Sequence, residues 1–292
     1  MKNIKILSIF FLIFLIGAIG AKVEEVQEQT EDPCLLNIAT FNLRMDTPKD
    51  GENAWPNRQE MVKGLIRFHD FDLFGTQEGF RYMLDSIASL GGYAYTGGGR
   101  DDGREAGEHS AIFYKTDRFE LLDNGNFWFS QTPDVPGKGW DATCCNRICS
   151  WGKFREKKSK KEFYFFNSHY DHQGKVARRE SSKLLLARIR QIAGPGATVF
   201  VTGDFNAVPT DEPIVTLATD GLLLDAYKES RQPPYGTTGT SNGFRTDADM
   251  NARIDYIWVT KGTTVHKYGV LNDMPYNRYP SDHFPVMIVA GF

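Results

Sequence analysis

Cysteine is scarce in this sequence, which has only Cys34, Cys144, Cys145 and Cys149 among its 292 residues. So few cysteines exclude a scaffold held together by disulfides, because such folds rely on several bridges in place of a large core. No CxxC pair with histidines at a matching distance is present, so a zinc site is not indicated. We expect structural thiols. A bridge that involves Cys34 or Cys149 remains an alternative, whereas adjacent Cys144 and Cys145 can pair only through a strained ring.

A strong excess of charge is also lacking, since 34 basic and 37 acidic residues give a net charge of −3. Proteins that bind long nucleic acids usually show a basic domain or stripe, so this balance argues against a broad nucleic-acid groove. It leaves room for a local basic pocket. The hydrophobic content of 41% and the aromatic content of 13% are sufficient for a packed core and exclude a disordered chain.

A long apolar run occurs at the N-terminus, where Lys2 and Lys5 precede the apolar residues 6–16 and small residues follow at 17–21. This order is typical of a secretory signal peptide over residues 1–21. A membrane anchor is the alternative, but the run is short for the about 20 residues that a span needs. We expect residues 22–34 to form a flexible leader. The mature protein is then expected to be secreted or periplasmic, with no membrane segment after cleavage; association with an outer surface stays open.

Strand and helix patterns are mixed along the rest of the chain without a linker or a repeat. Helical periodicity and end signals predict helices over 57–69, 80–90 and 175–192. Apolar and aromatic runs predict strands over 35–43, 71–76, 110–114, 119–129, 148–154, 163–170, 198–202, 254–260, 265–270 and 285–290. This predicts one α+β domain over 35–292, with helices flanking packed sheets. The segment 131–147 is long for a strand connection and is expected to form one wall of a site.

Acidic or amide side chains stand where five of these strands begin or end. They are Asn42, Glu78, Asp204 with Asn206, Asp255, and Asp282 with His283. Any one of them alone could be an ordinary turn residue, but irregular strand ends are where functional sites are commonly placed. As a set they are rich in oxygen donors, which suits Mg²⁺, with Mn²⁺ as the alternative, and does not suit zinc or copper.

Six short motifs carry a resemblance to a known family. They are Thr40-Phe41-Asn42, Gln77-Glu78, His169-Tyr170-Asp171-His172, Gly203-Asp204-Phe205-Asn206, Asp255-Tyr256 and Ser281-Asp282-His283. On these motifs the chain resembles the endonuclease/exonuclease/phosphatase superfamily, and within it the deadenylase and nocturnin group and secreted metal-dependent hydrolases of gut Bacteroidetes. The resemblance implies the deoxyribonuclease I-like fold, a four-layer α/β/β/α sandwich with two mainly antiparallel sheets, and a catalytic domain over 35–292.

The resemblance also implies how the residues divide the work. Glu78, Asn42 and Asp282 would lie at the divalent ion, which neutralises charge on the phosphate oxygens. His283, oriented by an adjacent carboxylate, would act on the attacking water or polarise the phosphate. Asp204 would position the nucleophile.

A second group is expected around the leaving group and the phosphate. His169 would be a second catalytic histidine that Glu108 supports, and Asp255 would orient this histidine or the leaving-group side. Asn206 would donate to a phosphoryl oxygen and Arg147 would contact the substrate phosphate. Two further arginines in expected loops, Arg44 and Arg100, are candidates for the same phosphate pocket, and Asp171 and His172 could extend toward substrate.

Four functions fit these observations. The first is a secreted Mg²⁺-dependent phosphoesterase that hydrolyses a phosphodiester or phosphomonoester by metal-assisted attack of water. The alternatives are a nuclease, in particular a 3′-5′ exoribonuclease, and a sphingomyelinase-type lipid phosphodiesterase. A non-catalytic binding protein is disfavoured, because every expected catalytic position is present. The expected partner is the phosphoester substrate, a small molecule or an oligonucleotide, and no stable protein partner is implied.

Overall fold

The computed structural model describes residues 35–292, so the expected signal peptide and leader lie outside the described residues. Its strands are β1 (Leu35–Asn42), β2 (Leu73–Gln77), β3 (Tyr93–Thr96), β4 (Ile112–Lys115), β5 (Phe119–Trp128), β6 (Ile148–Glu156), β7 (Glu162–His169), β8 (Val199–Asp204), β9 (Leu223–Asp225), β10 (Asp255–Thr260), β11 (Thr264–Val270) and β12 (Val286–Gly291). Its helices are α1 (Trp55–Phe68), α2 (Arg81–Ala88), α3 (Lys175–Ala193), α4 (Glu212–Thr219) and α5 (Ala226–Glu229), with short 3-10 helices η1 (Pro48–Asn53) and η2 (Pro275–Asn277).

The strands form two sheets of six. One has the order β11-β12-β1-β2-β4-β3 and the other the order β5-β6-β7-β8-β10-β9. Each contains one parallel pair at its centre, β1 with β2 and β7 with β8, and the other pairs are antiparallel. The expected pair of mainly antiparallel sheets is therefore confirmed.

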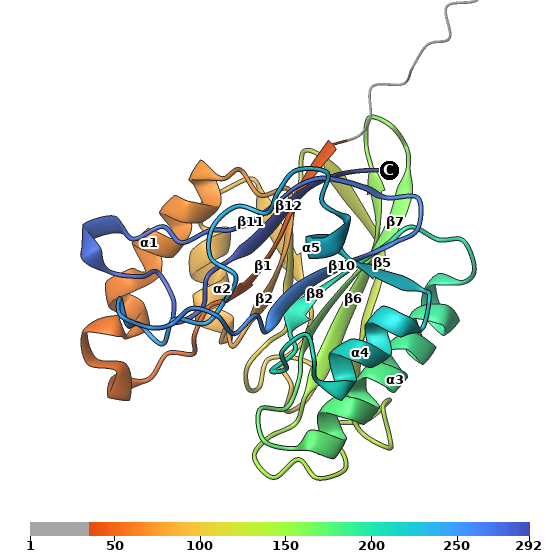
Figure 1. Cartoon of the computed structure of the whole chain (residues 1–292), viewed down its shortest axis with the longest axis horizontal. Helices are drawn as coiled ribbons and strands as arrows, with labels where there is room; N and C mark the ends of the chain where they lie inside the picture. Colours follow the sequence, from red (N-terminus) through yellow and green to blue (C-terminus); the bar gives the residue numbers. More distant parts are fainter. Residues whose placement is uncertain (1–34) are drawn as a thin grey trace, which may run out of the picture. The chain divides into compact units, whose positions relative to one another are not determined.

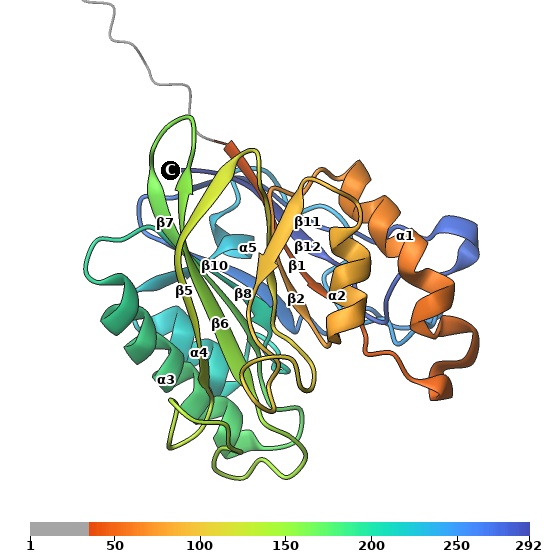
Figure 2. The same ribbon diagram turned by 180° about the vertical axis from the view of Figure 1, so that it is seen from behind.

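Three apolar clusters separate four layers. The central cluster joins the inner faces of the two sheets, with Leu36 and Ile288 from one and Phe165 and Ile257 from the other. A second cluster packs α1 and α2 on the first sheet, and a third packs α3 and α4 on the second. Figures 1 and 2 show the two helical layers on opposite outer faces. None of the helices within 35–292 is long and apolar enough to cross a membrane.

Most elements agree with the expectation to within a few residues, and the differences have local causes. Strand β3 is not among the predicted strands, because a run of four residues bounded by glycines carries little periodicity. The predicted elements also lack α4, β9 and α5, which occupy 212–229 as short consecutive pieces. These additions extend the layers at their edges and leave the architecture as expected.

A buried polar contact joins the two sheets near the ends of their parallel strands. Asn167 on β7 donates its side-chain N–H to the carbonyl of Thr76 at 2.8 Å and accepts from the Gln77 amide at 2.7 Å. Gly75 makes room for this contact, since a methyl group there would lie 2.3 Å from Oδ1 of Asn167. The Asn167 amide is fully paired, and a buried amide of this kind fixes one relative position of the surfaces that it joins. The contact therefore sets how the ends of the sheets meet.

Candidate active site

Strand register brings the polar strand ends together. Asn42 ends β1 beside the end of β2, where Glu78 follows. On the other sheet Asp204 is paired with His169 on one side and with Asp255 on the other. All five side chains thus project from the same edge of the sandwich, although they lie far apart in sequence.

Asn42 links the two sheets at this edge. Its side-chain N–H groups donate to Glu78 Oε1 and to Asp204 Oδ2, each at 3.0 Å, while its oxygen accepts from the backbone N–H of Arg44 at 2.9 Å. One lone pair of the Asn42 oxygen therefore binds the backbone, and the second is available to a metal, as the resemblance implied. In addition, Asn42 positions the carboxylates of Glu78 and Asp204.

Glu78 is held with its carboxylate toward the cavity. Besides Asn42, it accepts from the backbone N–H of Met45 at 3.0 Å. Burial alone would raise the pKa of Glu78, but these hydrogen bonds and the charges of His283 and Arg44 together outweigh it and lower the pKa. Glu78, Arg44 and Asn206 all adopt positive φ angles, at 63°, 55° and 48°, a region that non-glycine residues rarely occupy. Such strain clusters at functional sites.

His283 forms the shortest contact between a histidine and a carboxylate in the site. Its Nδ1 lies 2.8 Å from Oδ2 of Asp255, and both residues are buried. Burial lowers the pKa of His283, but the charges of Asp255, Asp204 and Asp282 prevail and hold the pKa well above its usual value. Because Asp255 fixes Nδ1, the ring presents Nε2 to the cavity, 3.9 Å from Asp204 Oδ2.

The surroundings of His169 shift its pKa in the direction opposite to that of His283. Its Nε2 lies 3.6 Å from Oδ2 of Asp204, and burial together with the cations Arg147 and Arg100 lowers the pKa of His169 well below its usual value. Asp204 itself is buried beside Asp255, which raises the pKa of its carboxyl to about 7. The site therefore contains one histidine that favours the charged form and one that favours the neutral form.

Glu108 and Asp255 were both expected to support His169, and in the structure each contacts another residue. Glu108 accepts from Arg100 at 2.6 Å, and within 35–292 no hydrogen bond joins it to His169. The expectation that Glu108 supports His169 is therefore wrong at the level of contact, although both residues line the same small hollow. Asp255 orients His283 rather than His169. Strand β10 places Asp255 and the loop before β4 places Glu108, and the sequence does not show which histidine each of them faces.

The expected arginines all reach the cavity. Arg147 is buried and pairs with Asp171, with Nε 3.4 Å from Oδ2, and its Nη2 lies 2.6 Å from Nδ1 of His172. Arg44 binds Asp50 at 2.8 Å and its Nε lies 3.8 Å from Asp282 Oδ2. These contacts fix the guanidinium groups in place, which suits bidentate recognition of a phosphate.

The cavity has a volume of about 460 Å³. Its lining combines the carboxylates and histidines with the three arginines, Asn206, Met45, Cys144, Cys145 and His172. Asn206 donates from its side chain to the carbonyl of Tyr170 at 3.1 Å, which leaves a second N–H for a ligand. A larger hollow of about 580 Å³ lies over α1 and shares no lining residue with this cavity.

The cysteines depart from the sequence expectation. Cys144 and Cys145 form a disulfide with each other, whereas Cys149 is a buried free thiol whose burial raises its pKa to about 12. The expectation of a structural thiol is confirmed for Cys149 and wrong for the adjacent pair. Cys34 lies outside the described residues.

The donor set fits a divalent cation. Ligand atoms of Glu78, His169 and Asp204 lie within 4.8 Å of one another, and so do those of Asp204, Asp255 and His283. Burial and the neighbouring Glu78 raise the pKa of Asp282, as burial and Asp255 raise that of Asp204. Such buried, uncompensated carboxylates are what a bound cation neutralises.

The fold and the site define a hydrolase of phosphate esters, and the comparisons agree. Residues 39–283 match the model of the Endonuclease/Exonuclease/phosphatase family, so the chain belongs to this family. It is an enzyme of the kind whose members hydrolyse phosphoesters and generally depend on a divalent metal.

Similar proteins of known structure or name include phosphatases and nucleases. A mannosyl-6-phosphatase of Bacteroides thetaiotaomicron is 41% identical and superimposes with a TM-score of 0.85, over 88% of this chain and 100% of that one. An endonuclease/exonuclease/phosphatase of Bacteroides vulgatus is 35% identical with a TM-score of 0.84, over 88% and 99%. Human nocturnin is 26% identical over 201 residues, which are 62% of this chain but only 43% of nocturnin. The expected relation to Bacteroides hydrolases and to nocturnin is confirmed.

Proposed function

We propose that this protein is an exported Mg²⁺-dependent phosphatase that hydrolyses a small phosphorylated sugar. The observation that carries the proposal is the cavity of about 460 Å³, which gathers Glu78, Asp204 and His283 beside Arg44, Arg100 and Arg147. Pockets of about 300–1,000 Å³ suit small molecules. The mannosyl-6-phosphatase that is 41% identical over its whole length supports a sugar phosphate as the substrate class.

Glu78 and Asp282, with Asp204 adjacent, are the residues that would hold the cation. When bound, the cation supplies charge neutralisation on the phosphate and acidifies a water molecule. Asn42 keeps the carboxylates of Glu78 and Asp204 at a fixed separation, so this arrangement exists before substrate arrives.

The proton chemistry falls to the histidines. Asp255 fixes Nδ1 of His283, so His283 exchanges a proton with water or phosphate through Nε2. Asp204, bonded to Asn42 and close to both histidines, positions the attacking water. The free N–H of Asn206 donates to a phosphoryl oxygen without adding negative charge beside it.

Export is part of the proposal and is supported by two observations. The first is the order of basic, apolar and small residues at 1–21. The second is the Cys144–Cys145 disulfide, since disulfides persist in oxidising compartments and are rare in the cytosol. Comparing the N-terminal residue of the mature protein with Lys22 would test cleavage after residue 21.

An exoribonuclease is the second candidate, which is favoured by 24% identity over 314 residues with the CCR4-Not complex 3′-5′-exoribonuclease subunit Ccr4 of Aspergillus niger. The net charge of −3 weighs against long nucleic acid as the substrate. The sphingomyelinase-type alternative has no comparable support among the observations.

The test is turnover by the purified protein with Mg²⁺ or EDTA on mannose 6-phosphate, bis-p-nitrophenyl phosphate and an oligo(A) RNA. We expect EDTA-sensitive release of phosphate from mannose 6-phosphate. Faster turnover of oligo(A) than of either small ester would replace the proposal with the exoribonuclease. Turnover that survives EDTA would remove the metal from the mechanism.

A further inference from the structure

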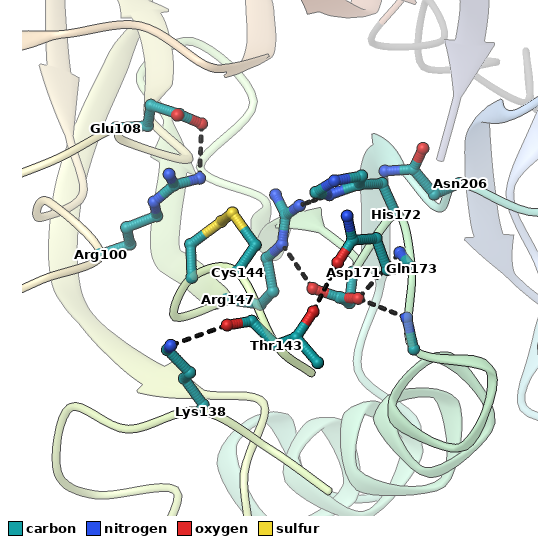
Figure 3. The surroundings of a disulfide bond; sticks show 12 residues. Arg100, Glu108, Lys138, Thr143, Cys144, Arg147, Asp171, His172, Gln173 and Asn206 are labelled. Carbon is teal, nitrogen blue, oxygen red and sulfur yellow. Dashed lines mark hydrogen bonds and ion pairs between the residues drawn. A yellow bond between two sulfur atoms is a disulfide. The ribbon is translucent and has the colours of Figure 1, made fainter. Parts of the chain in front are cut away.

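The disulfide between Cys144 and Cys145 lies in the wall of the catalytic cavity. Both cysteines line that cavity, Cys144 being exposed and Cys145 half-buried. They belong to the long connection between β5 and β6, and Figure 3 shows the disulfide beside the side chains of Arg147 and Arg100. The family motifs and the proposed chemistry assign no role to these two residues.

The segment that carries the disulfide is anchored on its N-terminal side to the start of α3. The carboxylate of Asp141 accepts from the backbone N–H groups of Val176 at 3.1 Å and Ala177 at 2.7 Å, where the helix leaves N–H groups unpaired. Lys138 donates to the carbonyl of Thr143 at 2.8 Å. The chain is therefore held in place immediately before the disulfide.

The other side of the disulfide is anchored to the same part of the fold. Arg147, two residues after Cys145, pairs with Asp171 and lies 2.6 Å from Nδ1 of His172. On the N-terminal side, Thr143 also donates its hydroxyl to the side chain of Gln173. Both anchors thus attach to residues 171–173 and to the start of α3 (Figure 3), so the disulfide is presented to the cavity from a fixed position.

The disulfide is one of two places in the cavity lining that carry no charged, amide or imidazole side chain. Of the 14 residues within 35–292 that line the cavity, only Met45, Cys144 and Cys145 are neither charged nor hydrogen-bonding amides or imidazoles. The backbone N–H of Met45 binds Glu78, so Met45 lies at the carboxylates that would hold the cation. The disulfide lies with Arg147 and His172 instead. Small-molecule sites combine apolar contact with a few polar groups that fix orientation.

We propose that the Cys144–Cys145 disulfide is the surface against which the leaving group of the substrate packs, and that this leaving group is a pyranose. The inference rests on the proposed sugar phosphatase function. A disulfide is compact and polarisable and forms only weak hydrogen bonds, so it suits the C–H face of a sugar ring. His172, whose Nδ1 contacts Arg147, supplies a polar partner for the hydroxyl groups around that face.

The lining also argues against a nucleobase at this place. Proteins that bind single-stranded nucleic acid stack successive bases on aromatic side chains. Within residues 35–292, no Phe, Tyr or Trp is among those that line this cavity. The leaving-group side therefore matches a single saccharide better than an oligonucleotide.

The test compares the hydrolysis of two phosphomonoesters by the purified full chain. They are mannose 6-phosphate and ethyl phosphate, and the leaving group of ethyl phosphate is too small to reach the disulfide. The measured quantity is the ratio of their kcat/KM values in Mg²⁺. We expect Cys144→Ala/Cys145→Ala to lower this ratio by on the order of tenfold, as for the loss of one or two apolar groups from a substrate pocket. A disulfide that merely stiffened the loop would lower both kcat/KM values together and leave the ratio unchanged.

Two controls accompany the variant. Lys138→Ala loosens the loop without changing the cavity wall, so its ratio should equal that of the unmodified protein. Reduction by a water-soluble phosphine replaces the S–S bond by two S–H bonds while the phosphine takes the oxygen of one water molecule. It should lower the ratio in the unmodified protein and have no effect in the double variant, which gives a second measurement if the double variant folds poorly.

The outcomes separate the inference from the function on which it rests. A lowered ratio of the two kcat/KM values, both in the double variant and after reduction of the unmodified protein, supports the inference that the sugar packs on the disulfide. An unchanged ratio in a folded double variant, with EDTA-sensitive turnover of mannose 6-phosphate retained, overturns the inference and leaves the function standing. Failure of the unmodified protein to hydrolyse mannose 6-phosphate overturns both.

Discussion

Replacing Asp255 by asparagine tests whether the Asp255 carboxylate enables His283 to exchange a proton during catalysis. The substitution keeps the shape of the side chain but removes the charge 2.8 Å from Nδ1, in a pair whose members are both buried. A hydrogen bond to a charged group contributes about 1.5–3 kcal/mol. Because each 1.36 kcal/mol is a factor of ten in rate, we expect kcat/KM for mannose 6-phosphate to fall about 10- to 150-fold.

The assay is a double-mutant cycle with His283→Ala. If Asp255 acts through His283, Asp255→Asn should cost almost nothing once His283 is absent, because residues that act as a unit are not additive. Asp225→Asn is the matched control, since Asp225 is equally buried and pairs with Arg253 at 2.7 Å. It should lower Tm and leave kcat/KM unchanged. Additive losses in the cycle would refute the reasoning.

Three further outcomes follow from other contacts. Gly75→Ala should lower the free energy of unfolding by about 1–3 kcal/mol, since its methyl group would lie 2.3 Å from Asn167 Oδ1; an unchanged denaturant midpoint would contradict this. In unreduced Cys34→Ser protein, a thiol reagent should find no reactive thiol in the folded state and only Cys149 after unfolding, and three thiols would disprove the disulfide. Mg²⁺ at 100 times its Kd should stabilise the unmodified protein by about 2.7 kcal/mol, and Glu78→Gln should abolish this shift in thermal melting; a shift that persists would show that the ion binds elsewhere.

The layers and the membership of the site could be predicted from the sequence, because they depend on local patterns. Apolar strands that end in Asn42 or Asp204, or that follow Asp282, are visible as runs of residue types, and the ends of strands in packed sheets meet at common edges. The same holds for the connection before β6, which forms a wall of the cavity as expected.

The partnerships inside the site could not be predicted. Asp255 pairs with His283, and Glu108 with Arg100, because of how neighbouring strands and loops are aligned across the sandwich. Asn42 joins Glu78 to Asp204 across the two sheets, and the sequence does not reveal this contact. Such pairings depend on contacts between residues that lie tens of positions apart in the sequence, and a local sequence pattern does not predict them.

The site is divided between the two sheets, and this has a consequence for how activity arises. His283 precedes β12 of one sheet and its partner Asp255 begins β10 of the other, and the bond from Asn42 to Asp204 crosses the same boundary. Neither sheet alone carries all of the side chains that the proposed reaction needs. Catalytic activity is thus a direct reporter of sheet docking, and during refolding it should return with the last docking step.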